Sequence, residues 1–437
     1  MITRDYYTET ISPVERIDLQ AIADIEISSI ELEDHPNLLV FPDSLYTYDR
    51  DFGKKYICSI SKDGEKLTTN SIVGFVGRNN THLSIHSRFS DKGKNDYFLH
   101  YLIQKVSKVN VLNLNHSFDE DSIFDFLLYL FPSYLKKALG QGLYKQYISV
   151  EHNDANVRGV ISINRHIKFN EPFNGKISYR TREYSFDNHI TQLIRHTIEY
   201  IASTPVGIDI LKIDDEMRQA VKIISDATPS YSYKERLSII NRNLRPISHP
   251  YYGEYIGLQR LCLQILRHDE LKYGQEENEI YGVLIDAAWL WEEYLADVLK
   301  CKFNHCVMDS GKRFYLFENN IQRIIPDYLS IDKTLVADAK YIPLDQHDDY
   351  EDEKATAIYY KTIAYMSRFG SSKGYLLYPH KDYSTSPYTE YILQSDTPSI
   401  ARYIIKVGMR IPNGCEDYLA FAGKMYQEET LFRDLIQ

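Results

Sequence analysis

The segment from Arg323 to Tyr341 restricts the possible folds of this chain more than any other part of the sequence. Two stretches rich in β-branched residues, 323–331 and 334–342, flank the polar dipeptide Asp332-Lys333. Apolar runs of this length on either side of a short turn signal are typical of two paired, buried strands. We therefore expect a buried β-hairpin with its turn at residues 332 and 333.

Three charged residues lie within this apolar hairpin. Asp338 and Lys340 are two residues apart, so they should point to the same face of a strand. Asp327, on the first strand, can meet them there. Burying these charges is costly unless they pair or hold a metal ion, and carboxylate oxygens suit Mg²⁺. The hairpin therefore predicts a magnesium site.

A predicted helix over 278–303 directly precedes the hairpin and carries two adjacent glutamates. Its apolar stripe consists of Leu284, Ala288, Trp291, Leu295 and Leu299. We expect Glu292 to lie at the edge of this stripe and face inward, with Glu293 solvated. The chain then offers Glu, Pro-Asp and Asp-Ala-Lys in that order, each on the element type that a metal-dependent nuclease needs.

An acidic residue followed two positions later by lysine is a weak signal alone. Three such triplets occur, at Glu270-Lys272, Asp338-Lys340 and Asp352-Lys354. The first lies at the end of a predicted helix and the last in an acidic polar run, so only the second lies on an apolar strand. The alternative to a catalytic site is a salt-bridged pair of strands.

Phosphodiester hydrolysis assigns a role to each of these residues. The reaction needs a metal ion to neutralise charge on the phosphate and to activate a water molecule. Asp327 and Asp338 would bind Mg²⁺, for which Mn²⁺ could substitute, helped by the carbonyl of Ala339. Glu292 would lie in the inner or outer shell of the ion, and Lys340 would orient the water or stabilise the transition state.

Composition and motifs narrow the possible functions. The sequence has no apolar run long enough for a membrane span and no signal-peptide core, and its five cysteines are scattered, so we expect a cytoplasmic protein. It contains no GxxxxGK[ST], GxGxxG or GxSxG motif, which argues against nucleotide binding and a serine nucleophile. Residues Cys301, His305 and Cys306 lack a second pair at zinc spacing, and we expect them to pack.

The order of predicted elements indicates an α+β protein of several domains. Residues 1–110 look β-rich, residues 111–250 mix helices with strands, and residues 251–437 alternate helices and strands around a central mixed sheet. The helix expected over 122–143 should be interrupted near Pro132. The last segment carries 20 basic against 29 acidic residues, so it should bind a polyanion poorly without a partner.

Cations are concentrated in the strand-like segment 157–187. They are Arg158, Arg165, Lys168, Lys176, Arg180 and Arg182, and Glu171 is the only acid among them before Glu183. Such a cluster predicts phosphate contacts with DNA. A solvated strand face is an equally good interpretation.

The motifs together resemble a known family. The order Glu, Pro-Asp, Asp-Ala-Lys resembles the PD-(D/E)xK nuclease superfamily. More narrowly, WLWEEYLADVLK, IIPDYLSID, VADAKY and YYKTIAYMSRFG, preceded by IVGFVGRNNTHLSIHSRF and VRGVISINRHI, resemble the McrC family, the nuclease subunit of McrBC-type restriction systems. The resemblance starts at about Ser71 and implies a PD-(D/E)xK nuclease core in residues 251–437.

The resemblance also implies a partner. McrC-type subunits work with an McrB-like AAA+ GTPase hexamer that recognises and translocates double-stranded DNA, while the N-terminal half docks onto the motor. Family members often carry Gln at the position of Lys361, where a lysine can still reach phosphate. Two rival interpretations remain open: a non-catalytic regulator that retains a nuclease scaffold, and a nuclease that cuts without a partner.

Overall fold

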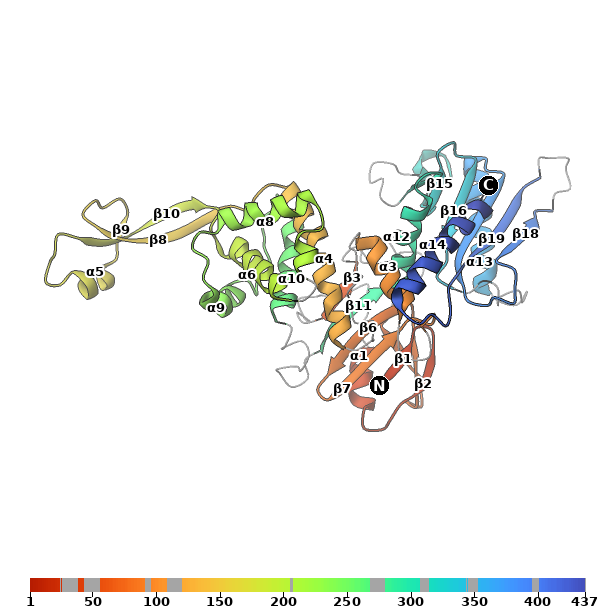
Figure 1. Ribbon diagram of the computed structural model, residues 1–437, viewed down its shortest axis with the longest axis horizontal. Helices are drawn as coiled ribbons and strands as arrows, with labels where there is room; N and C mark the ends of the chain where they lie inside the picture. The colour runs from red at the N-terminus through yellow and green to blue at the C-terminus, as the bar shows by residue number, and fades with distance from the viewer. Residues whose placement is uncertain are drawn as a thin grey trace. The chain divides into compact units, whose positions relative to one another are not determined.

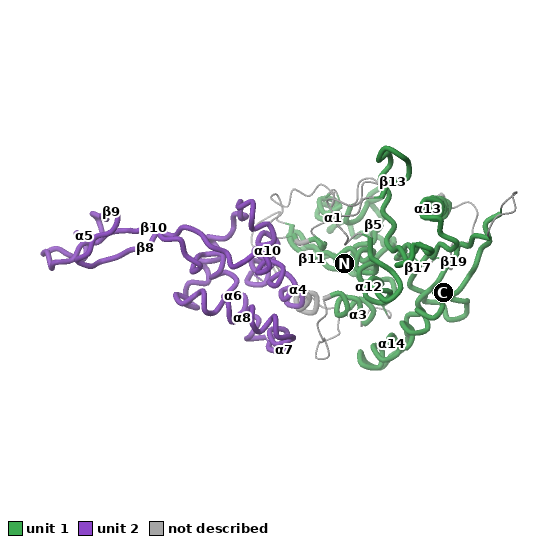
Figure 2. The backbone as a smooth tube through the Cα atoms, turned by 90° about the horizontal axis from the view of Figure 1, so that it is seen from above, with its two compact units in different colours: residues 1–123, 270–437 green, residues 124–269 purple. Residues whose placement is uncertain are grey.

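A computed structural model describes most of the chain. The described residues are 1–23, 25, 38–42, 56–90, 96–107, 120–204, 207–267, 280–306, 314–342, 344, 353–394 and 401–436. They form two compact units, unit 1 with residues 1–123 and 270–437, and unit 2 with residues 124–269 (Figure 2). No helix in the described ranges is both long and apolar enough to cross a lipid bilayer.

The first sheet of unit 1 combines strands from both ends of the chain (Figure 1). Its strand order is β1-β7-β6-β11-β3. The bounds are Ile2–Arg4 (β1), Thr81–His86 (β7), Ile72–Arg78 (β6), Ile280–Asp286 (β11) and Leu38–Phe41 (β3). β1 is parallel to β7 and β3 to β11, whereas β6 is antiparallel to both of its neighbours. β11, about 200 residues after β7 in the chain, therefore lies inside a sheet whose other strands all come from the first 86 residues.

The helix expected over 278–303 is wrong in its first part, which forms β11. The helix α12 (Ala287–Leu299) begins only after this strand, where the side chain of Asp286 accepts a hydrogen bond from the backbone N–H of Ala288 at 2.9 Å. Every residue of β11 is buried, so its sequence is apolar on both faces. Periodicity alone does not distinguish such a strand from a buried helix.

Two glycines let β6 and β11 approach each other. Gly74 has φ +129° and Gly282 has φ +149°, both in the region that disfavours residues with a side chain. A Cβ atom on Gly74 would lie 2.1 Å from the carbonyl oxygen of Val283. A Cβ atom on Gly282 would lie 2.3 Å from the carbonyl oxygen of Phe75. Close pairing of these strands therefore requires glycine at both positions.

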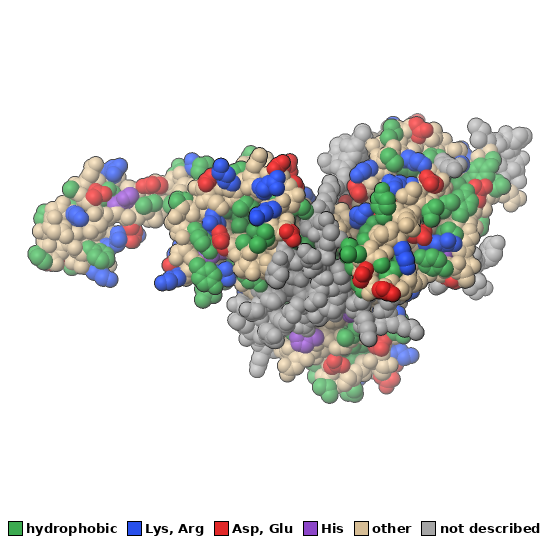
Figure 3. All heavy atoms as spheres, in the orientation of Figure 1, with side chains coloured by type: hydrophobic (Ala, Val, Ile, Leu, Met, Phe, Trp, Pro, Cys, Tyr) green, Lys and Arg blue, Asp and Glu red, His purple; other side chains and the backbone are tan. Residues whose placement is uncertain are grey.

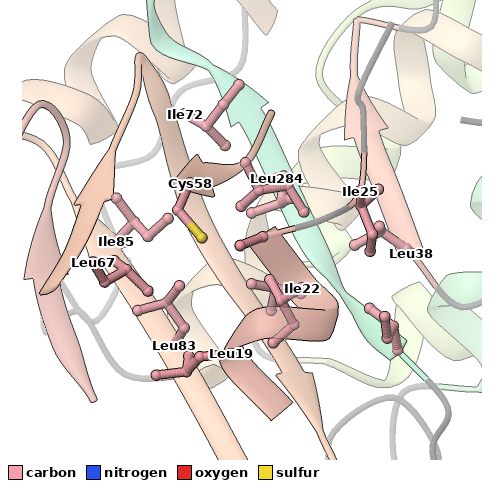
Figure 4. Packing of buried hydrophobic residues seen from close by; sticks show 14 of the residues in the cluster. Leu19, Ile22, Ile25, Leu38, Cys58, Leu67, Ile72, Leu83, Ile85 and Leu284 are labelled. Carbon is pink, nitrogen blue, oxygen red and sulfur yellow. The ribbon is translucent and has the colours of Figure 1, made fainter. Parts of the chain in front are cut away.

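The core of this region lies between the first sheet, a smaller sheet and one helix (Figure 4). The smaller sheet has the order β2-β5-β4, with bounds Thr8–Thr10 (β2), Lys66–Thr69 (β5) and Cys58–Ile60 (β4). Helix α1 (Arg16–Ala23) inserts Leu19 and Ile22 among buried residues of both sheets, such as Leu67 and Leu284. Burial of apolar side chains from segments far apart in sequence holds these elements together.

The second sheet of unit 1 is six-stranded and mixed. Its order is β12-β15-β16-β17-β19-β18. The bounds are Phe303–His305 (β12), Tyr328–Ser330 (β15), Leu335–Ala339 (β16), Lys373–His380 (β17), Tyr403–Arg410 (β19) and Tyr388–Ile392 (β18). Only β16, β17 and β19 are parallel neighbours. The α+β class and the central mixed sheet expected from the sequence are confirmed.

The predicted hairpin is present as β15 and β16, which pair antiparallel with Tyr328 opposite Ala337. Its turn is held by Asp332, whose side chain accepts hydrogen bonds from the hydroxyls of Ser330 (2.6 Å) and Thr334 (2.8 Å). The first predicted strand, 323–331, is broken at Pro326, which has no backbone N–H to donate. Its beginning forms β14 (Arg323–Ile324), which pairs instead with β13 (Phe314–Tyr315).

Helices cover both faces of the second sheet. The hydroxyl of Tyr294 on α12 donates a hydrogen bond to the sulfur atom of Met409 in β19 at 3.2 Å. Lys406, three residues earlier, lies 5.8 Å from the ring centre of Tyr359 on α13 (Glu353–Phe369). Since side chains alternate along a strand, α12 and α13 cover opposite faces. α14 (Tyr418–Leu435) shares the side of α12, because its Glu429 accepts a hydrogen bond from Tyr294 at 2.9 Å.

Unit 2 is a helical body with a projecting arm. The helices are α4 (Glu120–Gly140), α6 (His189–Ser203), α7 (Gly207–Leu211), α8 (Asp215–Ala227), α9 (Arg236–Arg242) and α10 (Glu254–Leu266). α6 packs against α7, α8, α9 and α10. The arm, residues 146–185, consists of β8 (Gln146–Asp154), β9 (Val160–Ile161), α5 (Ile163–Asn170) and β10 (Ile177–Ser185), and it extends from the helices (Figure 1).

Three local expectations for the middle of the chain differ from the structure. Residues 163–170 form the helix α5 rather than strand, and Asn170 is the only buried residue in this helix. α4 continues through Pro132 without interruption. The sequence suggested three consecutive segments, 1–110, 111–250 and 251–437. The two compact units divide the chain differently, because unit 1 combines residues 1–123 with residues 270–437.

Replacing Gly282 with alanine should lower the free energy of unfolding by about 3 kcal/mol, because the new Cβ atom meets a backbone carbonyl and the backbone is strained. Chemical denaturation followed by circular dichroism measures the loss. Gly423→Ala is the matched control, since Gly423 lies inside α14 with open space around it, and alanine there should stabilise the helix by about 0.5–1 kcal/mol. Equal stability of the two variants would contradict this account of the β6–β11 pairing.

Candidate active site

Acidic and basic side chains of unit 1 gather where β15 begins and β16 ends, which is the same end of the antiparallel hairpin. Asp338 of β16 is only 2% exposed. Its Oδ2 atom forms an ion pair with the Nζ atom of Lys340, so the two side chains share one face, as the alternation along the strand predicted. A buried carboxylate and a half-buried ammonium group therefore meet at the end of β16.

Asp327 joins this pair from the other side of the hairpin. It lies immediately before β15, and its Oδ2 atom accepts a hydrogen bond from the backbone N–H of Ala339 at 2.7 Å. The backbone carbonyl of Asp327 accepts a hydrogen bond from the N–H of Cys306 at 2.9 Å. The Pro-Asp segment is thus fixed between β16 and the end of β12.

Glu292 reaches the same region from α12. Its backbone carbonyl accepts a hydrogen bond from the hydroxyl of Tyr328, the first residue of β15. Its Oε1 atom lies 2.8 Å from Nε2 of His305 on β12. Glu292 is therefore directed at the strands, as expected, but Glu293 is half-buried rather than solvated.

The charges of these groups act on one another. Burial raises the pKa of Glu292 to about 8, and the carboxylates of Glu293 and Asp338 add to this shift. Burial, together with repulsion from Asp338 and Glu292, also holds the pKa of Asp327 well above its ordinary value. Crowded carboxylates raise each other's pKa, whereas a nearby cation lowers it. Glu292, Asp327 and Asp338 therefore form one electrostatic cluster, here called the acidic cluster.

Asp338 differs from the other two carboxyls because cations flank it. Burial acts to raise its pKa, but the ammonium groups of Lys340 and Lys361 more than offset this and hold the pKa below its ordinary value. For Lys340, burial acts to lower the pKa, and the charges of Asp338 and Asp327 raise it further than burial lowers it. Asp338 and Lys340 therefore remain an ion pair, although Asp338 is buried and Lys340 is half-buried.

Lys361 is a second lysine at the acidic cluster. It lies on α13, and its Nζ atom is 3.9 Å from Oδ1 of Asp338. It also lies 5.6 Å from the ring centre of Tyr365, whose hydroxyl donates a hydrogen bond to the carbonyl of Ile325 at 3.0 Å. Helix α13 is thereby tied to the chain just before Asp327. The sequence marked Lys361 as a candidate phosphate contact, and the structure places it beside the hairpin.

The oxygen atoms of the acidic cluster suit a hard divalent cation, although the ammonium group of Lys340 now lies against Asp338. Within the described ranges, no three His, Cys, Asp or Glu side chains are grouped tightly enough to hold a metal ion. Both carboxylate oxygens of Asp338 are nevertheless buried without a hydrogen-bond donor of regular geometry. Carboxylate and carbonyl oxygens are the ligands that Mg²⁺ prefers. Asp327, Asp338 and the carbonyl of Ala339 therefore fit the ion chemically once the Asp338–Lys340 pair separates.

The predicted basic residues lie on the arm of unit 2. Arg158, Lys168, Arg180 and Arg182 are exposed, whereas Arg165 is half-buried and pairs with Glu151 at 3.0 Å. Exposed apolar side chains accompany them, including Val160 (71%), Ile163 (67%) and Phe173 (69%). Figure 3 shows basic and hydrophobic side chains side by side on the arm. These cations therefore all lie on the arm.

Sequence reasoning missed two residues that support the acidic cluster. His305 was expected only to pack, yet it contacts Glu292 and lies 5.4 Å from the ring of Tyr328. Tyr328 was part of the predicted strand, but its bond to the carbonyl of Glu292 was not anticipated. The signal for His305 was its position at the end of a short strand immediately after the glutamate-bearing helix. Strand pairing, which the sequence does not specify, decides that it meets Glu292.

Comparisons with known proteins place the chain among restriction-system components. Residues 67–379 match the family model described as McrBC 5-methylcytosine restriction system component. One similar structure is a half-complex from a tetradecameric assembly of Thermococcus gammatolerans McrB AAA+ hexamers with bound McrC. The sequence identity is 14%, the match covers 100% of this chain and 99% of that chain, and the TM-score is 0.46. Another is the Thermococcus gammatolerans McrBC complex, with 13% identity, 72% and 89% coverage and a TM-score of 0.29. No curated protein matches the chain.

Two substitutions of the same kind should have opposite effects on the stability of the metal-free protein. Asp327→Asn should raise the free energy of unfolding by about 1 kcal/mol, because it removes repulsion from Asp338 and retains an acceptor for Ala339. Asp338→Asn should lower it by about 3 kcal/mol, because Lys340 and Lys361 lose their counter-charge. Thermal unfolding in the presence of EDTA measures both. Effects of the same sign would refute the unequal charge compensation described above.

Proposed function

The chain belongs to the McrBC 5-methylcytosine restriction system component family, and from that premise we propose that it is the Mg²⁺-dependent DNA endonuclease subunit of such a system. The observation that carries the proposal is the acidic cluster together with Lys340. A glutamate from one helix and two aspartates and a lysine from one hairpin meet there with little exposure to solvent. A core under no chemical demand has little reason to keep so much buried charge.

The order and placement of these residues support a PD-(D/E)xK nuclease core. Glu292 lies on α12, which comes before the strands of the second sheet in the chain. Asp327 follows Pro326 and directly precedes β15. Asp338 lies on β16, and Lys340 directly follows this strand. The two strands bring the aspartates together through the hydrogen bond from Ala339 to Asp327. The fold therefore provides an acid on the helix, an acid on each side of the hairpin and a lysine beside them.

The residues that would hold the metal ion are Asp327, Asp338 and the carbonyl of Ala339, with Glu292 in its inner or outer shell. Mg²⁺ is the proposed ion, with Mn²⁺ as a substitute. When bound, such an ion supplies charge neutralisation at a phosphate and a more acidic water. The ammonium group of Lys340 would be released from Asp338 to stabilise negative charge at the phosphate or to orient the attacking water.

Lys361 would contribute a second positive charge on the α13 side of the site. It lies close enough to Asp338 to help keep that carboxylate ionised, and its side chain remains partly exposed at 28%. Two half-buried ammonium groups side by side suit contact with the DNA backbone. We propose that Lys361 contacts a phosphate flanking the cleaved bond.

The proposed partner is an McrB-like AAA+ GTPase hexamer, as in the assemblies named for the similar structures. The N-terminal part of the chain, predicted from the sequence as 1–110, would dock onto the motor and stimulate GTP hydrolysis. The substrate would be double-stranded DNA in the cytoplasm. The excess of acidic residues in 251–437 supports a division of labour in which the motor supplies most of the affinity for DNA.

The basic residues of the arm are candidate DNA contacts. Five of the six cations are exposed, all but Arg165. The guanidinium carbon of Arg182 lies 4.6 Å from the ring centre of Tyr147, which limits its freedom. Exposed cations on a narrow ribbon can follow a phosphate backbone. The alternative, a solvated face without a ligand, predicts that neutralising these cations leaves DNA affinity unchanged.

Two rival functions make different predictions. A non-catalytic regulator would stimulate the motor but would not need the acidic cluster for any reaction. A stand-alone nuclease would cut DNA without the partner or GTP. The retained acid and lysine set favours a nuclease over a regulator, and the family assignment favours a subunit over a stand-alone enzyme.

Asp327→Asn is the sharpest test, because the variant should fold at least as well as the parent yet lose a metal ligand. With the partner, GTP, Mg²⁺ and plasmid DNA, methylated at cytosine or not, cleavage should fall at least about 100-fold. Lys340→Ala should cause a similar loss. Stimulation of GTP hydrolysis by the partner should persist in both variants, since the N-terminal elements are unchanged.

Glu318→Gln serves as a control, because it removes an exposed carboxylate of unit 1 outside the acidic cluster. Cleavage that survives in Asp327→Asn and Lys340→Ala at the level of this control would refute the site. Cleavage by the parent chain with Mg²⁺ alone would favour the stand-alone nuclease, and stimulation without any cleavage would favour the regulator.

Removing two cations from the arm should weaken DNA binding by the complex. The double variant Lys168→Ala with Arg180→Ala should lower the slope of log affinity against log salt concentration by about 1 to 2, as expected for lost phosphate contacts. Fluorescence anisotropy with labelled duplex DNA over a range of salt concentrations measures the slope. The control Lys222→Ala with Lys234→Ala removes the same charge from exposed positions outside the arm. Equal slopes in the two double variants would support the solvated-face interpretation.

A further inference from the structure

Tyr341 connects the proposed catalytic lysine to the N-terminal half of unit 1. It directly follows Lys340 and is only 4% exposed. Its hydroxyl lies 3.0 Å from Oγ of Ser87, a residue 254 positions earlier in the chain. Ser87 follows β7 of the first sheet and is completely buried. A direct hydrogen bond therefore joins the segment after β7 of the first sheet to the segment after β16 of the second sheet, next to Lys340.

The turn that carries Ser87 is held in place by two buried carboxylates. Asp5 accepts hydrogen bonds from the backbone N–H of Arg88 at 2.5 Å and from its Nε atom at 2.8 Å. Asp96 accepts a hydrogen bond from the N–H of Ser87 at 2.7 Å. Charge-assisted bonds of this kind are strong and geometrically specific. The turn of residues 87–89, here called the anchor turn, therefore provides a firm attachment point.

The anchor turn also contacts the ring of Tyr341. The guanidinium carbon of Arg88 lies 5.1 Å from the ring centre, and the ring of Phe89 lies 5.4 Å from it at an angle of 73°. Lys381, just after β17, donates a hydrogen bond to the carbonyl of Arg88 at 3.0 Å. The side chain of Tyr341 is thus held by its hydroxyl and by two groups against its ring.

Lys340 lies between this attachment and the second sheet. Its backbone N–H donates a hydrogen bond to the carbonyl of Leu377 in β17 at 2.8 Å, and its side chain pairs with Asp338. The backbone at Lys340 is therefore fixed on one side by β17 and on the other by the anchor turn through Tyr341. A small displacement of a catalytic group can cost a large factor in rate.

We propose that Tyr341 is a positioning residue for Lys340, and that its hydrogen bond to Ser87 makes the N-terminal sheet part of the catalytic apparatus. This inference rests on the proposed nuclease function. It adds a physical route by which a partner bound to the N-terminal elements reaches the site, since movement of the anchor turn moves the residue next to Lys340.

The test compares Tyr341→Phe, Ser87→Ala and the double variant in the full chain with its partner, GTP, Mg²⁺ and plasmid DNA. Each single variant should lower kcat about tenfold and leave KM for DNA unchanged, because the charge of Lys340 remains but its position is less restricted. The double variant should lose no more than either single variant, since both remove the same contact. GTP hydrolysis by the partner should stay at the parent level.

Tyr281→Phe is the matched control, because it removes another buried tyrosine hydroxyl from unit 1, one that lies 3.1 Å from Nδ1 of His82 and has no contact with Lys340. It should leave kcat unchanged. Values of kcat within twofold of the parent in Tyr341→Phe and Ser87→Ala would overturn the proposal. An equal loss in Tyr281→Phe would overturn it as well, since general destabilisation would then explain the effect.

A second measurement does not depend on cleavage. Hydrogen–deuterium exchange of the full chain without DNA or partner should be faster at the amides of 338–342 in Tyr341→Phe and Ser87→Ala than in the parent or in Tyr281→Phe. Unchanged exchange in both variants would overturn the positioning role. Faster exchange together with full cleavage by Lys340→Ala would instead show that the link exists and that the proposed catalytic assignment is wrong.

Discussion

The ion pair of Asp338 with Lys340 is the interaction on which the geometry of the acidic cluster depends. A carboxylate that is 2% exposed must keep its cations, because loss of either partner leaves an uncompensated charge in the core. The sheet order, the packing of α13 with Lys361 and the bond between Asp327 and Ala339 all preserve this local geometry. At Glu292 and Asp327, burial and the neighbouring carboxylates outweigh the effect of Lys340, so the pKa of each is raised.

The second feature of unit 1 is that elements from both ends of the chain form one structure. β11 completes the N-terminal sheet and leads directly into α12, which carries Glu292. Glu429 of α14 accepts hydrogen bonds from Tyr294 of α12 and from Tyr101 of α3 (Tyr97–Ser107). Together with the contact of Tyr341 and Ser87, these bonds anchor both the helix and the strand of the acidic cluster to N-terminal elements. A regulatory partner therefore needs no direct contact with the acidic cluster to influence it.

Unit 2 combines a packed helical body with an arm that has no core of its own. Its helices bury their apolar faces around α6, but the arm is a ribbon too narrow for a core of its own. Large side chains such as Phe173 and Ile163 stay exposed among the basic residues. Exposed apolar groups mixed with cations are typical of surfaces that contact another macromolecule. The two units thus divide the chain into a part that holds the acidic cluster and a part that presents an extended surface.

The sequence by itself determined the local elements: the hairpin of β15 and β16, the shared face of Asp338 and Lys340, and the part of the helix predicted over 278–303 that forms α12. These depend on alternation, helical periodicity and turn residues within a few positions. Only the tertiary structure decided that β11 is a strand, that Lys361 and His305 meet the acidic cluster, and that Ser87 supports Tyr341. Those outcomes depend on which distant segments pair, because a buried apolar run fits either a strand or a helix until its hydrogen-bonding partner is present.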